Sequence, residues 1–389
     1  MPNRREFLRA SVQFGAASAL AGALPGIIFA AAPGNRPFVV VILRGALDGL
    51  SAVPPYGDPA YRDARGPIAI APPGDARGAL DLDGFFALHP AMPLMHERWA
   101  AKELLVVHAT ASAYRERSHF DGQNVLETGG TAPYQMKDGW LNRLVSMLPA
   151  SKANAIALAS TVPLALRGRA EVTSYAPSAL PLAPDDLLMR VSQLYAGDPQ
   201  LHALWRSAMD ARGLAADAGA RQDPASLGKL AASFLGRSDG PRIAMIETGG
   251  WDTHSAQNQR LGAQLKALDT MMASMRDGLG EHWANTTVLV ATEFGRMATA
   301  NGTGGTDHGT ASAAMLLGGA VQGGRVLADW PGLAPSALYQ GRDLRPTLGL
   351  DSLIAAAAGE TFGLDPVHVR ATLFTQKTAS PMSSRLLRT

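Results

Sequence analysis

The sequence contains no cysteine, few aromatic residues (6%) and few charged ones (17%). The absence of cysteine excludes disulfides, thiolate metal ligands, a cysteine nucleophile and a cysteine-derived formylglycine. The 389 residues are 47% hydrophobic and include 41 glycines. This composition is typical of a soluble α/β protein and excludes a disordered or fibrous chain. The length suits one large domain or two medium ones.

The chain also lacks a strong charge of either sign. Its formal net charge is +2, from 35 basic and 33 acidic residues. Residues 1–31 hold three Arg and one Glu, so the remainder carries 32 residues of each kind. Nothing in this balance favours a nucleic-acid partner. After residue 31 there is no long apolar run, and we expect no stable membrane span there.

The first 31 residues resemble an export signal. Arg4 and Arg5 precede a moderately apolar, Ala- and Gly-rich stretch, and small residues follow at 30–32. This order predicts a signal peptide of the twin-arginine type over residues 1–31, with cleavage near Ala30 or Ala31. The alternative is an amphipathic or membrane helix, which the glycines and prolines of the stretch disfavour. We therefore expect a periplasmic or otherwise exported protein, with the twin-arginine export machinery as a partner.

Short apolar runs rich in β-branched residues predict buried strands. Between them, apolar residues step by three or four along 90–102 and 255–279, which indicates amphipathic helices. Alternating strands and helices predict an α/β fold: a doubly wound, mainly parallel sheet with helices on both faces. The predicted strands are 38–43, 104–109, 242–247, 287–292, 313–319 and, more weakly, 154–159.

We expect residues 32–389 to form a single domain with surface insertions. Residues 54–86 are rich in Pro, Gly and Asp and indicate an elaborated surface insertion. Residues 213–226 are small and polar, and predict either a hinge or a surface connection between helices.

Polar residues follow four of the predicted strands directly. Ligands of open parallel sheets bind in the crevice outside the carboxyl ends of the strands, so these residues are expected at one rim. A long Gly-, Thr- and Asn-rich loop after residue 292 would return to the same rim. The residues expected there are Arg44, Asp48, Ser112, Ser118, His119, Asp121, Asp252, His254, Glu293, Arg296, Asp307 and His308.

The negative charge of several carboxylates crowded at one rim must be compensated, and a divalent metal ion can do this where histidines lie beside the carboxylates. Residues two apart face the same side of an extended segment, so Asp252 and His254 can act together. Asp307 and His308 are adjacent and would point to opposite sides of an extended segment. One of them would therefore bind the metal, and the other would orient that ligand through a hydrogen bond. The predicted metal ligands are Asp48, Asp252, His254, Glu293, Asp307 and His308. The sequence does not distinguish between zinc, manganese, magnesium and calcium as the bound ion.

Each of these residues also has a structural interpretation. Asp48 could shape a turn before Gly49, and Glu293 could simply pair with Arg296. Ser118 opens a predicted helix that ends near residues 129–130, where a hydroxyl could attack a substrate held by the helix N-terminus. It could equally be a helix N-cap, and Ser112 is a second candidate nucleophile. The remaining histidines are predicted to be ordinary core or surface residues: His89, His96, His108, His202, His282 and His368.

The twin-arginine leader, together with "LRGALDGLS", "SHFDGQN", "GGWDTHS", "TEFGR" and "TDHGTA", resembles the exported bacterial domain-of-unknown-function family numbered fifteen hundred and one. That family is grouped with the alkaline phosphatase and sulfatase superfamily. The resemblance implies an alkaline phosphatase/sulfatase-like fold with two metal ions at the strand ends. It also implies Asp48 as an early metal ligand, Ser118 as the nucleophile, Asp252 with His254 as a metal pair, Glu293 at the start of a second pair and His308 as a late ligand.

Two departures accompany the resemblance. Phe294 stands where a metal histidine is usual, and one residue rather than three separates Asp252 from His254. If the protein is an enzyme, we expect metal-assisted hydrolysis of a phosphate or sulfate ester, small or polymeric, with Arg44 or Arg296 clamping the oxyanion through paired hydrogen bonds. The alternative is a non-catalytic exported binding protein for a glycan, polymer or protein. A calcineurin-like metallophosphatase would need a later Gly-Asn-His motif, which this chain lacks.

Overall fold

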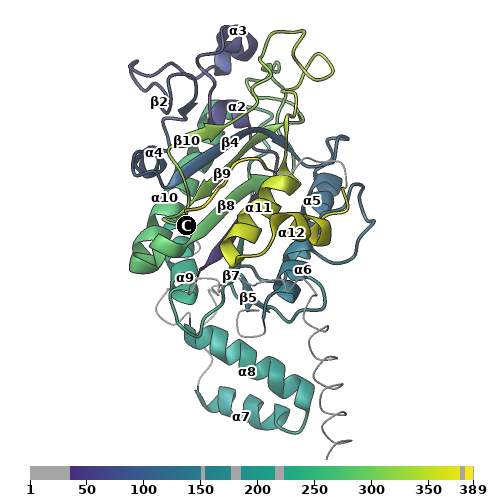
Figure 1. The fold of residues 1–389 in the computed structure, drawn as a ribbon. Coiled ribbons are helices and arrows are strands. Elements are labelled where there is room, and N and C mark those ends of the chain that lie inside the picture. Colours follow the sequence, from purple (N-terminus) through teal and green to yellow (C-terminus); the bar gives the residue numbers. More distant parts are fainter. Residues whose placement is uncertain (1–35, 150–153, 177–184, 215–222, 377–381, 389) are drawn as a thin grey trace, which may run out of the picture. The chain divides into compact units, whose positions relative to one another are not determined.

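A nine-stranded sheet forms the centre of the structure, a computed structural model (Figure 1). The structure describes residues 36–149, 154–176, 185–214, 223–376 and 382–388. All of them fall within one compact unit, Gly34–Thr389. The strands of the sheet are β1 (Phe38–Leu43), β4 (Leu104–Ala111), β5 (Ala155–Ala157), β6 (Thr173–Ser174), β7 (Ile243–Thr248), β8 (Thr287–Thr292), β9 (Ser312–Leu317), β10 (Arg325–Leu327) and β11 (Leu348–Gly349).

The strands lie in the order β10-β4-β9-β8-β1-β7-β5-β6, and β11 pairs with β4. Strand β1 runs parallel to both of its neighbours, β7 and β8. Strand β9 runs antiparallel to β8 and β4, and every other described pairing in this sheet is parallel. The carboxyl ends of β1, β4, β7 and β8 therefore share one edge, and β9 begins at that same edge.

Helices cover both faces of the sheet because alternate residues of its strands point in opposite directions. Val39, Val41 and Leu43 of β1 belong to a core with residues of three helices, α4 (Pro93–Ala100), α9 (Pro224–Leu235) and α10 (Gln257–Leu279). The intervening residues, Phe38, Val40 and Ile42, belong to a second core with residues of α5 (His119–Thr128), α6 (Trp140–Met147), α11 (Leu350–Phe362) and α12 (Pro366–Leu373). Figure 1 shows these two groups of helices on opposite sides of the sheet.

The helix boundaries follow ordinary capping chemistry. Asp223 and Asp365 cap α9 and α12 with their carboxylates, and a proline follows each of them at the first helical position. The helices are α2 (Gly49–Ala52), α3 (Tyr61–Arg65), α4 (Pro93–Ala100), α5 (His119–Thr128), α6 (Trp140–Met147), α7 (Asp185–Tyr195), α8 (Pro199–Leu214), α9 (Pro224–Leu235), α10 (Gln257–Leu279), α11 (Leu350–Phe362) and α12 (Pro366–Leu373). Short 3-10 turns lie at Gly66–Ile68, Leu164–Leu166 and Gly280–Asn285.

The predicted α/β class, the mainly parallel sheet and the helices on both faces are confirmed. Each predicted strand has a counterpart, displaced by two residues or fewer at each end. Residues 1–31 lie outside the described residues, as does most of 213–226. Among the helices that the structure describes, none combines the length and the apolar character needed to cross a bilayer.

The segment 54–86 is not purely a surface insertion. It contains α3, the strand β2 (Leu80–Asp81) and a 3-10 turn, and β2 pairs with β3 (Ala87–Leu88) in a separate two-stranded sheet. Tyr61 and Arg65 of α3 are buried, and Arg65 has no exposed surface. The segment therefore places a guanidinium inside the protein.

Candidate metal centre

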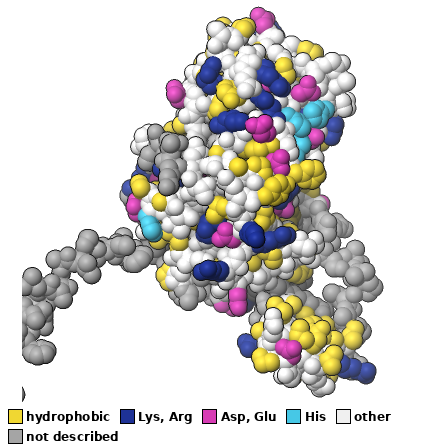
Figure 2. Space-filling model, turned by 90° about the vertical axis from the view of Figure 1, so that its right-hand side faces the viewer, with side chains coloured by type: hydrophobic (Ala, Val, Ile, Leu, Met, Phe, Trp, Pro, Cys, Tyr) yellow, Lys and Arg dark blue, Asp and Glu magenta, His cyan; other side chains and the backbone are white. Residues whose placement is uncertain are grey.

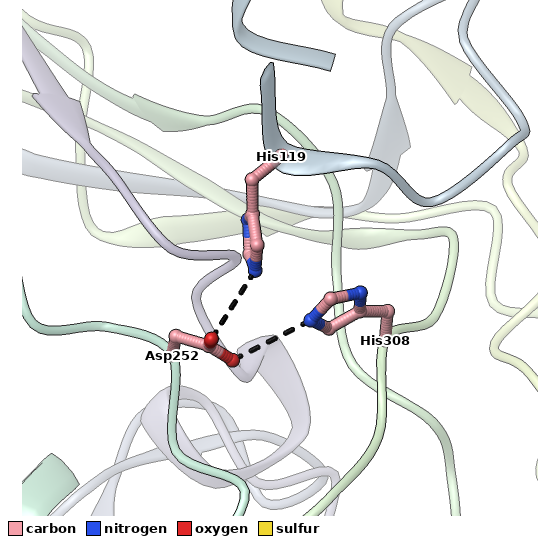
Figure 3. Close-up of side chains that lie close together, drawn as sticks. All are labelled: His119, Asp252 and His308. Atoms are coloured by element: carbon pink, nitrogen blue, oxygen red, sulfur yellow. Dashed lines mark ion pairs between the residues drawn. The ribbon is translucent and has the colours of Figure 1, made fainter. Parts of the chain in front are cut away.

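Three loops at the carboxyl edge of the sheet bring two histidines and an aspartate together. His119 is the first residue of α5, which follows β4. Asp252 lies between β7 and α10, and His308 lies between β8 and β9. One ligand atom from each of these three residues lies within 4.8 Å of the others (Figure 3). Of the described residues, this is the group of histidine and acidic side chains that could hold a metal ion.

The aspartate stands between the two histidines. Asp252 Oδ2 is 3.4 Å from His119 Nε2, and Asp252 Oδ1 is 3.5 Å from His308 Nε2. Figure 3 shows both imidazole rings turned toward this carboxylate. Asp252 is 41% exposed at its side chain, so the group is open to solvent. On the face drawn in Figure 2, histidine side chains gather at the surface beside acidic ones.

The His119 ring is held from behind by Glu293. His119 Nδ1 is 2.9 Å from Glu293 Oε1 and must donate, because an ionised carboxylate only accepts. Burial alone would raise the pKa of Glu293, but hydrogen bonds from His119, Gln123 and the Gly45 amide lower it below its ordinary value. In the neutral ring, Nε2 then carries the lone pair. That atom is buried and has no hydrogen-bond partner among the described residues.

The His308 ring is oriented in the same way by a backbone carbonyl. His308 Nδ1 donates to Arg117 O at 2.8 Å, which leaves its Nε2 as the lone-pair atom facing Asp252. Arg117 has a left-handed backbone (φ 60), which costs energy in a non-glycine residue. Its guanidinium is fixed by Asp343, at 2.9 Å from Nε to Oδ2. Asp343 also accepts from Thr310, two residues beyond His308.

The Asp252 carboxylate is kept ionised by its surroundings. Burial alone would raise its pKa, but the hydrogen bond and charge of Arg296, with His254 and His119, hold that pKa below its ordinary value. Arg296 Nη1 donates to Asp252 Oδ1 at 2.6 Å, which leaves Oδ2 facing His119. The backbone here is tightly packed: a Cβ on Gly45, whose φ is +120, would lie 2.6 Å from Asp252 N.

His254 stands at the edge of this group. Its Nε2 is 3.0 Å from Asp252 Oδ1 and 3.0 Å from His308 Nε2. Two imidazole nitrogens this close need either a proton or a cation between them. Its Nδ1 is 3.2 Å from Asp307 Oδ1. The hydrogen bond from Asn301, and secondly His254, lowers the pKa of Asp307 against the opposing effect of burial.

Asp48, which the sequence predicts as a metal ligand, lies apart from this group. It is 1% exposed, and its carboxylate caps α2 through Leu50 N and Ser51 N. Arg65 and Gln257 donate to the same carboxylate. The turn-shaping alternative therefore describes its position well, with an added buried ion pair. Glu293 contacts His119 rather than Arg296 and stands behind the group, not inside it.

The predicted catalytic residues are placed as follows. Arg44 pairs with Glu127 and Glu247, so its guanidinium is already occupied. Arg296 is fully buried at its side chain and is occupied by Asp252 and Thr306. Their role as oxyanion clamps stays a prediction.

Ser118 occupies the N-cap position of α5, as the structural alternative predicts, but its side chain makes no capping hydrogen bond. Ser112 is occupied: its hydroxyl donates to Glu293 O and accepts from Tyr114 N. Of the two serines considered as nucleophiles, Ser118 is therefore the less committed, and it directly precedes His119.

The donor set fits a transition-metal ion. Two imidazole nitrogens and a carboxylate suit zinc or a similar ion, whereas calcium and magnesium prefer oxygen ligands. A tetrahedral ion with bonds of about 2.0–2.1 Å separates any two ligand atoms by roughly 3.3 Å. Asp252 has Oδ2 at 3.4 Å from the His119 nitrogen and Oδ1 at 3.5 Å from the His308 nitrogen, so each oxygen is near this spacing from one histidine. The second ring nitrogen of each histidine is hydrogen-bonded to an acceptor, which is the usual arrangement behind a metal ligand.

His119 was not among the predicted ligands. In the sequence it follows the candidate nucleophile Ser118 and opens a predicted helix, where Asp121, two residues on, does not share its face as it would in an extended segment. Its partners, Asp252 and Glu293, lie more than 130 residues further along the chain. The signal that could have found it is its place after a predicted strand, on the same rim as the other candidates.

Comparison with sequence families identifies the group of proteins to which the chain is related. The family model described as "Protein of unknown function (DUF1501)" matches residues 36–373, and the chain belongs to this family. The match agrees with the motifs noted in the sequence. No curated protein sequence matches the chain significantly.

Several solved structures are similar in arrangement. The C-terminal periplasmic domain of EcEptC from Escherichia coli, in a complex with Zn, has 12% identity and a TM-score of 0.43, covering 91% of this chain and 93% of that one. Ps i-CgsB in complex with k-i-k-neocarrahexaose has 12% identity and a TM-score of 0.42, with coverages of 85% and 72%. The phosphonate monoester hydrolase of Agrobacterium radiobacter has 12% identity and a TM-score of 0.31, with coverages of 75% and 70%. All three scores lie below 0.5, so the residues of the site must support any functional argument.

Proposed function

We propose that this protein is an exported metal-dependent hydrolase of a phosphate or sulfate ester. One observation carries the proposal: two imidazoles point lone-pair nitrogens at the same carboxylate, and one of these nitrogens, His119 Nε2, is buried without a hydrogen-bond partner among the described residues. A buried polar atom without a partner costs energy, which a bound cation would repay.

The ion would be held by His119, Asp252 and His308, with His254 beside them. When bound, it would supply Lewis-acid stabilisation of charge on the transferring group. Zinc fits the donors best, and two imidazoles with one carboxylate also suit ferrous iron or manganese. Glu293 and the Arg117 carbonyl keep both rings in the ligand orientation, and Arg296 holds Asp252 as an anion.

Ser118 is the proposed nucleophile. Its hydroxyl makes no capping bond, it precedes His119, and it begins a ten-residue helix whose N-terminus favours negative charge. The hydroxyl oxygen would attack phosphorus or sulfur, the alcohol would leave, and water would then release the phosphate or sulfate from the serine. His254, 43% exposed at the rim, could exchange the protons with solvent.

A non-catalytic binding protein is the second candidate, because a specific observation favours it. Both guanidiniums predicted to clamp an oxyanion are occupied by carboxylates. In that case the metal group would anchor an anionic ligand, and no ester would be cleaved.

The test uses the full chain, purified without added chelator. We expect about one equivalent of zinc or another transition metal by elemental analysis. We also expect hydrolysis of p-nitrophenyl phosphate or p-nitrophenyl sulfate, which Ser118→Ala abolishes while metal content is retained. His119→Ala should lose both metal and hydrolysis.

Exposed His368 on α12 provides the control, since His368→Ala should change neither readout. Metal without hydrolysis of any ester would favour the binding protein. Metal content well below about half an equivalent, unchanged by His119→Ala, would reject both candidates.

A further inference from the structure

A cavity of about 360 Å³ lies beside the metal group, at the ends of β5 and β7. The end of β7, the residues that follow β5 and β7, and Ala176 after β6 contribute to its lining, as do residues of α9 and α10. Trp251 lines this cavity, and the next residue along the chain is Asp252 of the metal group. The cavity is lined by Leu158, Ala159, Ser160, Ala176, Pro224, Leu227, Glu247, Thr248, Trp251, Gln264, Ala267, Leu268 and Met271.

Apolar side chains form most of the lining, and its polar residues are Ser160, Glu247, Thr248 and Gln264. Leu158, Leu227, Leu268 and Met271 offer hydrocarbon surface, whose burial against a ligand is favourable. Among the described residues that line the cavity, Glu247 alone is charged. Pockets of this size with a few convergent polar groups are typical of sites for small molecules.

Glu247 has an unused acceptor. Its Oε1 receives a hydrogen bond from Arg44, whereas its Oε2 makes no hydrogen bond to any residue that the structure describes. The Gln264 side chain is likewise without a hydrogen-bond partner in the described part of the chain. It packs against Gly250, where a Cβ would lie 2.4 Å from Gln264 Nε2. The backbone at Gly250 has φ +88, so glycine serves both the turn and the close approach.

The charges around Glu247 do not balance. Arg44 is shared between Glu247 and Glu127, so one guanidinium faces two carboxylates. Glu127 is 5% exposed at its side chain and also accepts from Ala165 N at 3.0 Å, so it is turned inward. Glu247, 22% exposed, is the carboxylate that lines the cavity. The unbalanced negative charge therefore favours a cation there.

We propose that this cavity is a binding site for a primary amine with an apolar body. The ammonium group would donate to Glu247 Oε2 and to the Gln264 amide oxygen, and the body would lie against Leu158, Leu268 and Met271. A trimethylated ammonium could not make these hydrogen bonds, and a carboxylate would be repelled. The proposal concerns binding alone, and it stands whether or not the ester hydrolysis proposed above is found.

The test compares three probes of equal shape by calorimetry on the full chain: 3-phenylpropylamine, 3-phenylpropanol and 3-phenylpropanoate. The amine should bind at least about tenfold more tightly than the alcohol, and the carboxylate should not bind at about 10 mM. Ala267→Phe, which fills the cavity, should weaken amine binding at least about tenfold. Ala263→Phe, on the exposed face of the same helix, should leave it unchanged.

Glu247→Gln should remove the preference for the amine over the alcohol, because the charge is lost while the shape is kept. Zinc affinity, measured on the same variants, should stay within about threefold of the parent protein. Equal binding of amine and alcohol to the parent protein would overturn the proposal. Absence of amine binding, or amine binding unaffected by Ala267→Phe, would overturn it as well.

Discussion

Two carboxylates follow neighbouring strands of the sheet, Asp48 after β1 and Asp252 after β7, and they have opposite surroundings. Asp48 is 1% exposed and is enclosed by Arg65, Ser51 and Gln257. Asp252 is 41% exposed at its side chain and faces three imidazoles and one guanidinium. The same edge of one sheet therefore carries two regions: a closed region, the buried Asp48–Arg65 ion pair, and an open region, the solvent-exposed Asp252 with its histidines.

The difference shows what decides between structure and ligand binding at a strand end. Arg65, which has no exposed surface, pairs with Asp48, and Ser51 and Gln257 donate to the same carboxylate, so no cation is needed there. At Asp252, the arginine occupies one oxygen and leaves the other facing a histidine nitrogen that has no hydrogen-bond partner in the described residues. Gln257 links the two regions, donating to Asp48 and accepting from Thr306 beside Arg296.

The largest effect is expected in the closed region. Arg65→Met would leave Asp48 buried and unpaired, and should lower the free energy of unfolding by about 3–5 kcal/mol. Urea unfolding of the metal-free protein measures this loss. Adding Asp48→Asn to the variant should restore part of the stability, because the charge is then removed. A loss below about 1 kcal/mol would show that the pair is not the stabilising element described here.

The second effect is a pH dependence that belongs to the same region. His108 is fully buried, and burial lowers its pKa to about 4 from 6.5. Its Nδ1 accepts from Ala109 N, a bond that protonation would break. The unfolded chain binds this proton first, so the contribution of His108 is complete above pH 6.5 and is lost as the pH falls toward 4.

That contribution amounts to about 3 kcal/mol at most. His108→Gln cannot titrate and should therefore show a shallower loss of stability between pH 7 and 4 than the parent protein. Parallel unfolding curves for the two proteins over that range would contradict the assignment.

In the open region the effect falls on metal binding rather than on stability. Asp252→Asn should weaken zinc binding by about 100-fold, equivalent to about 2.7 kcal/mol. The amide oxygen introduced by this substitution can still accept from the buried Arg296 guanidinium, so unfolding of the metal-free variant should change by less than about 2 kcal/mol, a smaller loss than in Arg65→Met. Competition with a chromophoric chelator measures the affinity. A large loss of stability with unchanged zinc affinity would show that Asp252 is a structural residue like Asp48 and not a metal ligand.

The smallest effect tests how the ligand ring is oriented. Glu293→Gln keeps an acceptor for His119 Nδ1 but removes its charge, and should weaken zinc binding by about tenfold. Asp307→Asn, which changes an exposed carboxylate next to His254, serves as the matched control and should change it by less than about threefold. Equal losses of zinc affinity in the two variants would contradict the specific role of Glu293 in orienting the His119 ring.

The sequence predicted the fold well because its signals are local. Apolar β-branched runs and the stripe of Leu261, Leu265, Leu268, Met272 and Met275 appear as buried strands and as the inner face of α10. The rule that ligands gather at strand ends also predicts Asp252, His254 and His308 at one edge, where the structure has them in contact.

The site itself could be predicted only in part, because its details depend on partners far away in the chain. Nothing local to Asp48 shows that Arg65 neutralises it, since that arginine belongs to a segment whose composition indicated a surface insertion. Nothing local to His119 shows that Glu293 holds its ring. The sequence shows which charged groups reach the edge, but not how they pair there.

Strand β9 runs antiparallel to both of its neighbours, β8 and β4, in the described part of the nine-stranded sheet. Because β8 ends and β9 begins at one edge, the connection over residues 293–311 leaves and rejoins the sheet at the same place. Residues inserted at its exposed tip, near Gly302 and Thr303, would leave every described strand in place. His308 lies on this connection, so variation among descendants could retune cation affinity while the scaffold beneath stays constant.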